Sequence, residues 1–76
     1  MTPDLDIDAI GLLCPLPVLR ARKALLGMRA GQILRLQADD PVAVIDVPHF
    51  CAQAGHVFLS ATSEGAVTTY LIRRGT

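Results

Sequence analysis

Apolar side chains follow two different spacings in the first half of this 76-residue chain. Apolar and acidic residues alternate over residues 5–9, and apolar and polar residues alternate again over residues 33–38. Such a period of two is typical of half-buried β-strands. Between these segments, apolar residues recur in steps of three and four, at Val18, Ala21, Leu25 and Met28. This spacing predicts a helix with one apolar face, and the Ala30-Gly31 pair is expected to end it.

The second half of the chain is predicted to contain a further helix. Asp39-Asp40-Pro41 is typical of a helix start, with a capping carboxylate and then Pro at the first helical position. The helix is expected to run to Ala54, after which Gly55 suits the left-handed conformation common at helix ends. Pro48 lies inside this segment and predicts a kink, or two short helices end to end.

Two strands are predicted at the end of the chain, over residues 56–62 and 66–73, joined by the Glu64-Gly65 turn as an antiparallel hairpin. The order β-α-β-α-β-β predicts a single domain over residues 1–76. Its fold class would be an α/β two-layer sandwich with at least one parallel crossover. A mixed four-stranded sheet would carry both helices on one face. The other face would contact water and would hold Asp6, Asp8, Arg35 and Gln37.

Composition removes several classes of function. Seven basic and seven acidic residues give no net charge, and aromatic residues make up 4% of the chain. We therefore expect no direct nucleic-acid binding, which relies on basic surfaces and aromatic platforms. The longest uncharged run, residues 9–19, is too short to cross a bilayer, and the N-terminus lacks the features of a secretory signal. Two cysteines make no disulfide framework, so we expect a reduced, cytoplasmic protein.

Cys14 carries the clearest chemistry in the sequence. It lies in the segment Gly11-Leu12-Leu13-Cys14-Pro15-Leu16-Pro17, between the first strand and the first helix. Because proline disfavours helical angles in the residue before it, Cys14 and Leu16 are expected to be extended, and Pro17 suits the first helical position. The place of Cys14 just before a helix predicts an exposed thiol. The helix dipole, with Arg20 and Lys23 one turn further on, predicts a modestly lowered pKa for this thiol. A buried helix-capping cysteine is the alternative.

The same segment argues against acyl-transfer catalysis. Pro15 and Pro17 have no N–H, so two donors that could stabilise an oxyanion are missing. The two histidines, His49 and His56, are remote in sequence. An exposed sulfur without catalytic partners indicates a carrier that is loaded by one protein and unloaded by another, rather than a stand-alone multi-turnover enzyme.

Residues 11–25 resemble the TusA (SirA-like) sulfur-carrier family, whose signature is Cys-Pro-x-Pro at the opening of the first helix. The resemblance continues in Asp39-Asp40-Pro41, Phe50-Cys51 and Gly55-His56, and so covers nearly the whole chain. It implies the same order of strands and helices. It also implies a persulfide on Cys14, supported by Gly11, Pro15 and Pro17, with no bound cofactor or metal.

The resemblance further implies transient protein partners. The sulfur donor would be of the cysteine desulfurase or rhodanese type, and the acceptor would serve tRNA thiolation, sulfur oxidation or cofactor biosynthesis. A monomer without membrane contact is expected. We hypothesise that Arg20 and Lys23 form the docking surface beside Cys14, with an apolar centre made of Leu12, Leu13 and Leu16. Alternatively, Leu12 and Leu16 fold under the first helix, and the basic residues form a solvated helix face.

For the remaining cysteine and the two histidines, a structural interpretation stands beside a functional one. Cys51 is expected in the core, although it could also be a second sulfur that resolves a persulfide on Cys14 as a disulfide. A zinc site could be assembled from Cys14, His49, Cys51 and His56, but the spacing of these residues matches no recurring zinc-binding pattern. His49 is expected to be exposed, and His56 to be at the surface or hydrogen-bonded. The competing functions are a non-catalytic RNA- or ribosome-binding module and a regulatory interaction domain.

Overall fold

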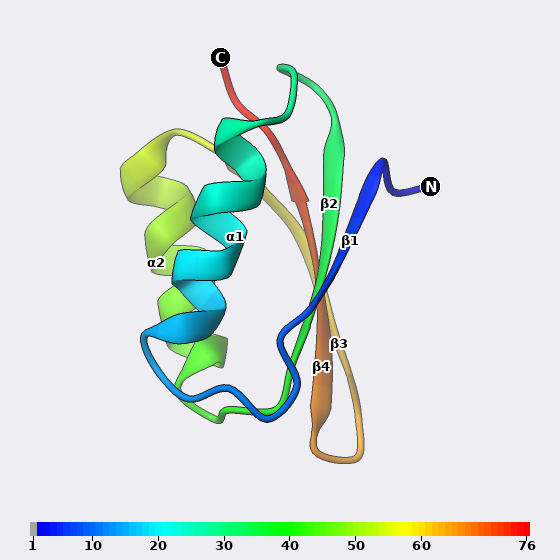
Figure 1. The fold of residues 1–76 in the computed structure, drawn as a ribbon, viewed down its shortest axis with the longest axis vertical. Helices are drawn as coiled ribbons and strands as arrows, with labels where there is room; N and C mark the ends of the chain where they lie inside the picture. Colours follow the sequence, from blue (N-terminus) through cyan, green and yellow to red (C-terminus); the bar gives the residue numbers. More distant parts are fainter. Residues whose placement is uncertain (1) are drawn as a thin grey trace.

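The computed structural model describes residues 2–76 as a two-layer sandwich of one sheet and two helices (Figure 1). The elements follow the predicted order: β1 Leu5–Asp8, α1 Leu16–Leu26, β2 Ile33–Ala38, α2 Ala43–Ala54, β3 Val57–Glu64 and β4 Val67–Arg73. The strands lie in the order β1-β2-β4-β3 across the sheet. Both helices cover the same face of this sheet, which confirms the predicted α/β sandwich.

The sheet is mixed, as predicted. β1 pairs with β2 in parallel, while β4 pairs with both β2 and β3 in antiparallel fashion. α1 forms the crossover that two parallel neighbouring strands require. The hairpin between β3 and β4 turns at Gly65, whose φ of 63° is a conformation that glycine adopts without strain.

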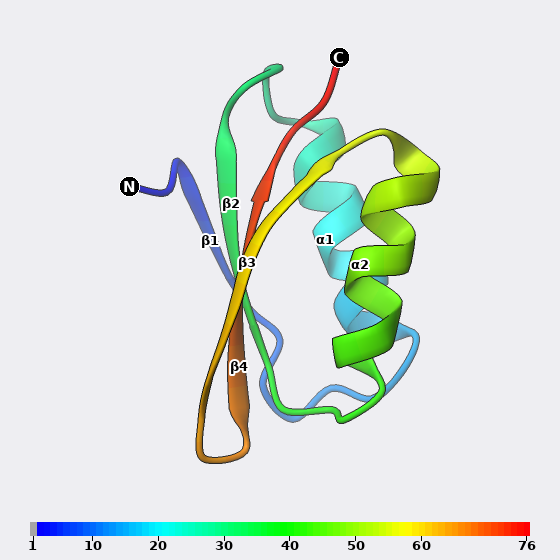
Figure 2. The same cartoon turned by 180° about the vertical axis from the view of Figure 1, so that it is seen from behind.

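The core lies between the sheet and the helices (Figure 2). Period-two alternation puts Leu34 and Leu36 of β2 on the covered face, where both side chains are fully buried. They pack with the other buried side chains of the sheet and helices, chiefly Tyr70, Ile72, Ala21, Leu25, Val47 and Cys51. On the opposite face, Asp6 and Arg35 form an ion pair in exposed positions. This face is the polar one that the alternation predicts.

α1 ends earlier than predicted. Its last residue is Leu26, and the N–H of Gly27 bonds to the carbonyl of Ala24 at 3.1 Å. The expected end at Ala30-Gly31 is therefore wrong by about one turn. Met28 is buried although it lies after the helix. The apolar spacing that predicts the helix therefore continues beyond the last helical residue.

α2 differs from prediction at its start. It begins at Ala43, and no side chain caps it, so neither Asp39 nor Asp40 is the N-cap and Pro41 lies before the helix. The helix runs unbroken through Pro48, so the alternative of two short helices is wrong. Pro48 has no N–H and leaves the Val44 carbonyl without its helical partner. Gly55 has the predicted left-handed conformation after the helix, with φ 79°.

The two helices run in the same direction, with their N-termini at the end of the molecule where β1 and β2 finish (Figure 1). This arrangement brings two loops together. The first spans residues 9–15 and leads from β1 to α1, and the second spans residues 39–42 and leads from β2 to α2. Neither α1 nor α2 has the length and apolar character needed to span a bilayer.

Candidate functional site

Two carboxylates of the second loop hold the backbone of the first. The N–H of Gly11 donates to Asp39 Oδ1 at 2.9 Å, and the N–H of Cys14 donates to Asp40 Oδ2 at 2.6 Å. Gly11 turns the chain with a φ of 85°, a conformation that favours glycine. Asp40 is buried, and its Oδ1 also accepts from the N–H of Val42 at 3.2 Å. The acidic pair therefore links the two loops instead of capping α2.

The proline residues set how the first loop enters α1. The helix starts at Leu16, whose N–H bonds to the carbonyl of Leu13 at 2.8 Å, and Pro17 occupies the second helical position. The expectation of an extended Leu16 with Pro17 at the first helical position is therefore wrong by one residue. Pro17 is buried among the core side chains, while Pro15 is exposed next to Cys14.

The thiol of Cys14 is exposed and faces α2. Its Sγ donates to Asp46 Oδ2 at 3.0 Å, and Asp46 lies in the first turn of α2. The predicted exposure of Cys14 beside a helix N-terminus is confirmed, and the alternative of a buried capping cysteine is wrong. The sulfur lies between the starts of both helices.

The pKa of the Cys14 thiol is shifted in the direction opposite to the prediction. The hydrogen bond to Asp46 raises the pKa of Cys14 above its ordinary value, with smaller contributions from desolvation by neighbouring atoms and from the negative charges of Asp46 and Asp40. The dipoles of two helices favour a thiolate, but a carboxylate in direct contact outweighs them. Arg20 and Lys23 are not among the charges that act on the thiol. Cys14 is therefore a protonated thiol at neutral pH, and the expected lowering of its pKa is wrong.

A shallow cavity of about 300 Å³ opens beside the thiol, between α1 and α2. Pro15 and Asp46, the neighbours of Cys14, form one end of it. Leu19, His49 and Phe50 line its walls, together with Val18, Arg22 and Gln53. A group that approaches the sulfur from this side meets a surface that is largely apolar. Leu19 and His49 were not predicted at the site, because nothing in the local sequence connects either residue with Cys14.

The predicted docking residues divide into three groups. Leu13 and Leu16 are 69% and 46% exposed, so they present apolar surface on either side of Cys14. Leu12 is half-buried and packs against the core, as the alternative interpretation predicts for this residue. Arg20 and Lys23 line another cavity, of about 490 Å³, with Leu5 and Ile7 on the β1 side of α1. The structure thus places the two basic residues away from the cavity beside Asp46.

The second cysteine and the histidines do not join this site. Cys51 is buried in the core, where burial raises the pKa of its thiol to about 11. His49 is exposed, and His56 is hydrogen-bonded, its Nδ1 accepting from the N–H of Gly75 at 3.0 Å. Within residues 2–76, no three His, Cys, Asp or Glu side chains gather to hold a metal ion, so the four residues considered for zinc do not form a centre.

Three carboxylates thus complete the site, and sequence reasoning missed their roles. Asp39 and Asp40 were interpreted as a local helix start, and Asp46 was not singled out. All three act on residues that are 26 to 32 positions away in sequence. One signal was present: the two parallel strands end in loops that must meet at the same edge of the sheet.

Removal of the Asp40 side chain is expected to destabilise the fold. The Asp40→Ala substitution leaves the N–H groups of Cys14 and Val42 without their acceptor, which should lower the free energy of unfolding by about 1.5–3 kcal/mol. Urea denaturation monitored by circular dichroism measures the difference. Glu64→Ala removes an exposed carboxylate from β3 and should change this free energy by less than about 0.5 kcal/mol. Equal midpoints for the two variants would contradict the role of Asp40.

Neutralising Asp46 is expected to make Cys14 more reactive. In Asp46→Asn the charge that opposes the thiolate is gone, so the thiol pKa falls toward its ordinary value. Each unit of decrease raises the thiolate fraction about tenfold and lowers its intrinsic nucleophilicity about threefold. Alkylation by iodoacetamide near pH 7.5 should therefore accelerate. Rate profiles against pH test this, with Glu64→Gln as the matched loss of charge. A variant profile that coincides with that of the unchanged protein refutes the interaction.

Comparison with known proteins agrees with this geometry. The family described as Sulfurtransferase TusA matches residues 5–74, which is nearly the whole chain. The fold is similar to the crystal structure of a SirA-like protein from Desulfitobacterium hafniense, with a TM-score of 0.76 and 28% sequence identity. That similarity covers 95% of this chain and 99% of the other. The chain belongs to the TusA family, and this membership indicates a sulfur-carrier role.

Proposed function

We propose that this protein carries sulfur as a persulfide on Cys14 and relays it between two partner proteins. The observation that carries this proposal is the unequal treatment of the two cysteines. Cys14 is exposed at the junction of two loops, whereas Cys51 is 1% exposed within the core. A partner can therefore reach one sulfur and not the other.

Loading requires no oxidant. The terminal sulfur of a donor persulfide, R–S–SH, bonds to the sulfur of Cys14, and the S–S bond within the donor breaks. The donor leaves as the thiolate R–S⁻, which takes up the proton released from the Cys14 thiol. Cys14 then holds the group Cys–S–SH, and the number of electrons in the two proteins together is unchanged. A thiolate performs this attack, so the proton of Cys14 must leave as the donor arrives.

Asp46 controls the protonation of the sulfur in this proposal. It lies 3.0 Å from the sulfur and keeps the unloaded Cys14 protonated, which protects the thiol from adventitious alkylation and oxidation. A persulfide is more acidic than a thiol, but the same carboxylate disfavours its anion. Asp46 therefore favours the protonated group Cys–S–SH, whose terminal sulfur the thiolate of an acceptor can attack. The S–S bond then breaks, the terminal sulfur passes to the acceptor, and Cys14 takes up a proton and returns to the thiol.

The site supplies little else, which is consistent with a carrier rather than a stand-alone enzyme. Pro15 and Pro17 have no N–H, and the N–H of Cys14 is already bound to Asp40. No free backbone donor at these three positions could stabilise an oxyanion. The chemistry would be completed by the donor, of the cysteine desulfurase or rhodanese type, and by an acceptor in tRNA thiolation, sulfur oxidation or cofactor biosynthesis.

Partner docking would use the apolar surface beside the sulfur and the charged surface of α1. Leu13 and Leu16 are exposed next to Cys14 and would be covered when a donor approaches. Arg20 and Lys23 lie on the same helix, toward β1, where they could attract an acidic donor over a longer range. Such charges act on the rate of association more than on the chemistry at the sulfur.

The central test measures the mass of the intact protein. After incubation with a cysteine desulfurase and cysteine, we expect a gain of one sulfur that a reductant removes. Cys14→Ser should abolish this gain, and the matched variant Cys51→Ser should retain it provided that it folds. Sulfur on Cys51, or no sulfur on a folded Cys14 protein with either a desulfurase or a rhodanese-type donor, would falsify the proposal.

A second test concerns docking. The double charge reversal Arg20→Glu and Lys23→Glu should slow sulfur transfer from the donor, because an acidic donor is then repelled. Both side chains are exposed on α1, so the circular dichroism spectrum and the thermal midpoint should be nearly unchanged. The double reversal Arg29→Glu and Arg73→Glu, at two exposed positions outside α1, serves as the control for charge alone. Equal transfer rates in all three proteins would exclude this docking surface.

A further inference from the structure

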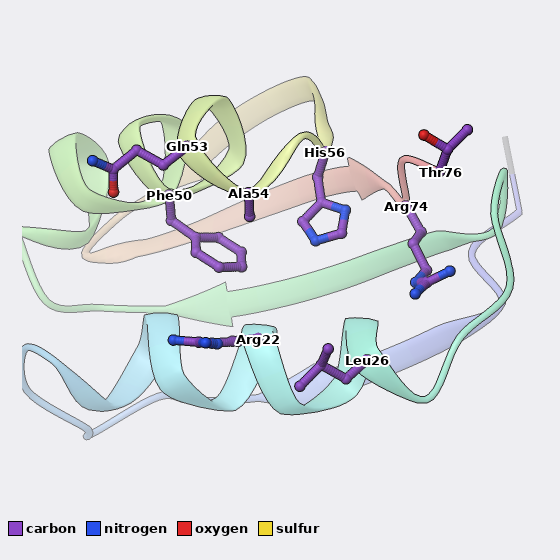
Figure 3. Close-up of a pocket in the computed structure, with 8 residues that line it drawn as sticks. All are labelled: Arg22, Leu26, Phe50, Gln53, Ala54, His56, Arg74 and Thr76. Carbon is purple, nitrogen blue, oxygen red and sulfur yellow. The ribbon is translucent and has the colours of Figure 1, made fainter.

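A second cavity lies between the helices, toward their C-terminal ends (Figure 3). It has a volume of about 400 Å³. Arg22 and Leu26 line it from α1, Phe50 from α2, and His56 and Arg74 from the segments that flank β3 and β4. Figure 3 shows Phe50 and His56 directed toward α1, Arg74 on the far side of His56, and Arg22 extending the other way, below Phe50. The proposed sulfur carrier function uses none of these five side chains.

Two arginines line the cavity, and no acidic side chain is among its lining residues. In residues 2–76 the ion pair that forms is between Asp6 and Arg35, on the opposite face of the sheet, so Arg22 and Arg74 have no carboxylate partner. The Nε of Arg74 is buried, and within residues 2–76 it has no hydrogen-bond acceptor. Water does not reach this atom, so a ligand cannot bind it, and the outer N–H groups of the Arg74 guanidinium are the ones available to an anion in the cavity.

His56 adds a neutral hydrogen-bond donor to the lining of the cavity. Its Nδ1 accepts from the N–H of Gly75 at 3.0 Å, so the proton of the neutral imidazole is on Nε2. Burial and the charge of Arg74 lower the pKa of His56, which keeps the ring neutral at physiological pH. The ring lies 5.7 Å from that of Phe50, between centroids, and this contact holds its orientation. The cavity therefore places an N–H donor beside the Arg74 guanidinium, while Arg22 lies at its other end (Figure 3).

The other wall is apolar. Leu26 is 70% exposed, one of the most exposed large apolar side chains of the chain, and Phe50 and Ala54 face it from α2. The volume of about 400 Å³ falls within the range of cavities that hold small organic molecules. A bare inorganic ion would leave the apolar wall in contact with water. A ligand that has an anionic head and a compact apolar body would cover both walls.

We propose that this cavity binds a small organic oxyanion, with a carboxylate, phosphate or sulfonate head held by Arg74 and His56 and an apolar body held against Leu26 and Phe50. Arginine suits such heads because its planar guanidinium can bind two oxygens at once. Arg22, Phe50 and Gln53 also line the cavity beside Cys14. The ligand would therefore lie in the same groove between the helices as the exposed thiol, at its other end.

Phenyl phosphate is a suitable probe, with inorganic phosphate and phenol as its separate halves. Titration followed by nuclear magnetic resonance should show saturable binding of phenyl phosphate, with shifts that centre on Leu26, Phe50, His56 and Arg74. Inorganic phosphate should bind more weakly, and phenol should not saturate the site. Arg74→Gln should weaken phenyl phosphate binding about tenfold or more, since it removes charge-assisted hydrogen bonds.

Arg20→Gln is the matched control, because it removes the same charge outside the cavity. It should change the affinity by less than about twofold, since salt screens exposed charges at this range. Equal losses in Arg20→Gln and Arg74→Gln would show non-specific attraction and overturn the proposal. Absence of saturation by phenyl phosphate, or saturation with shifts elsewhere, would also overturn it. Sulfur loading of Cys14 is a separate measurement, so either proposal can fail without the other.

Discussion

The contact on which the site depends is the one between a buried carboxylate and the backbone of the loop that presents the sulfur. Asp40 accepts from the N–H of Cys14 at 2.6 Å, and Asp39 accepts from the N–H of Gly11 at 2.9 Å. A loop with two prolines makes few hydrogen bonds of its own, so its shape must be imposed from outside. The neighbouring loop imposes it, because the parallel pairing of β1 and β2 ends both strands at the same edge. Sheet topology therefore determines where the thiol lies, and the acidic pair determines how it is held.

The same loop geometry sets the charge of the sulfur. Two helix N-termini point toward Cys14, an arrangement that in other proteins lowers the pKa of a thiol. Here Asp46 lies in contact with the sulfur and reverses this effect, because a full negative charge at hydrogen-bond distance exceeds partial charges that are further away. The free protein thus holds Cys14 as a protonated thiol. Under the proposed function, an incoming partner would have to disturb the contact between Asp46 and Cys14 before the thiol could attack, so reactivity would depend on docking.

The sequence predicts the architecture well and the site only in part. Period-two alternation identified β2 residue by residue, since the buried Leu34 and Leu36 face the helices and Arg35 faces water. The end of α1 was misplaced because Met28 continues the apolar stripe after Gly27 has ended the helix. Cys14 could be found because the prolines beside it mark the loop locally. Asp40 and Asp46 could not, because their partners are distant in sequence and only the packed fold brings them together.

The burial of Cys51 bears on how long the proposed persulfide would last on Cys14. A free thiolate in the same molecule would attack a persulfide, close an internal disulfide and release the outer sulfur as hydrogen sulfide. Two features keep Cys51 from this reaction: it is enclosed in the core, and its pKa of about 11 leaves it almost wholly protonated at neutral pH. Under the proposed function, the core would thus prevent this loss of sulfur, and the lifetime of the persulfide would depend on the encounter with an acceptor.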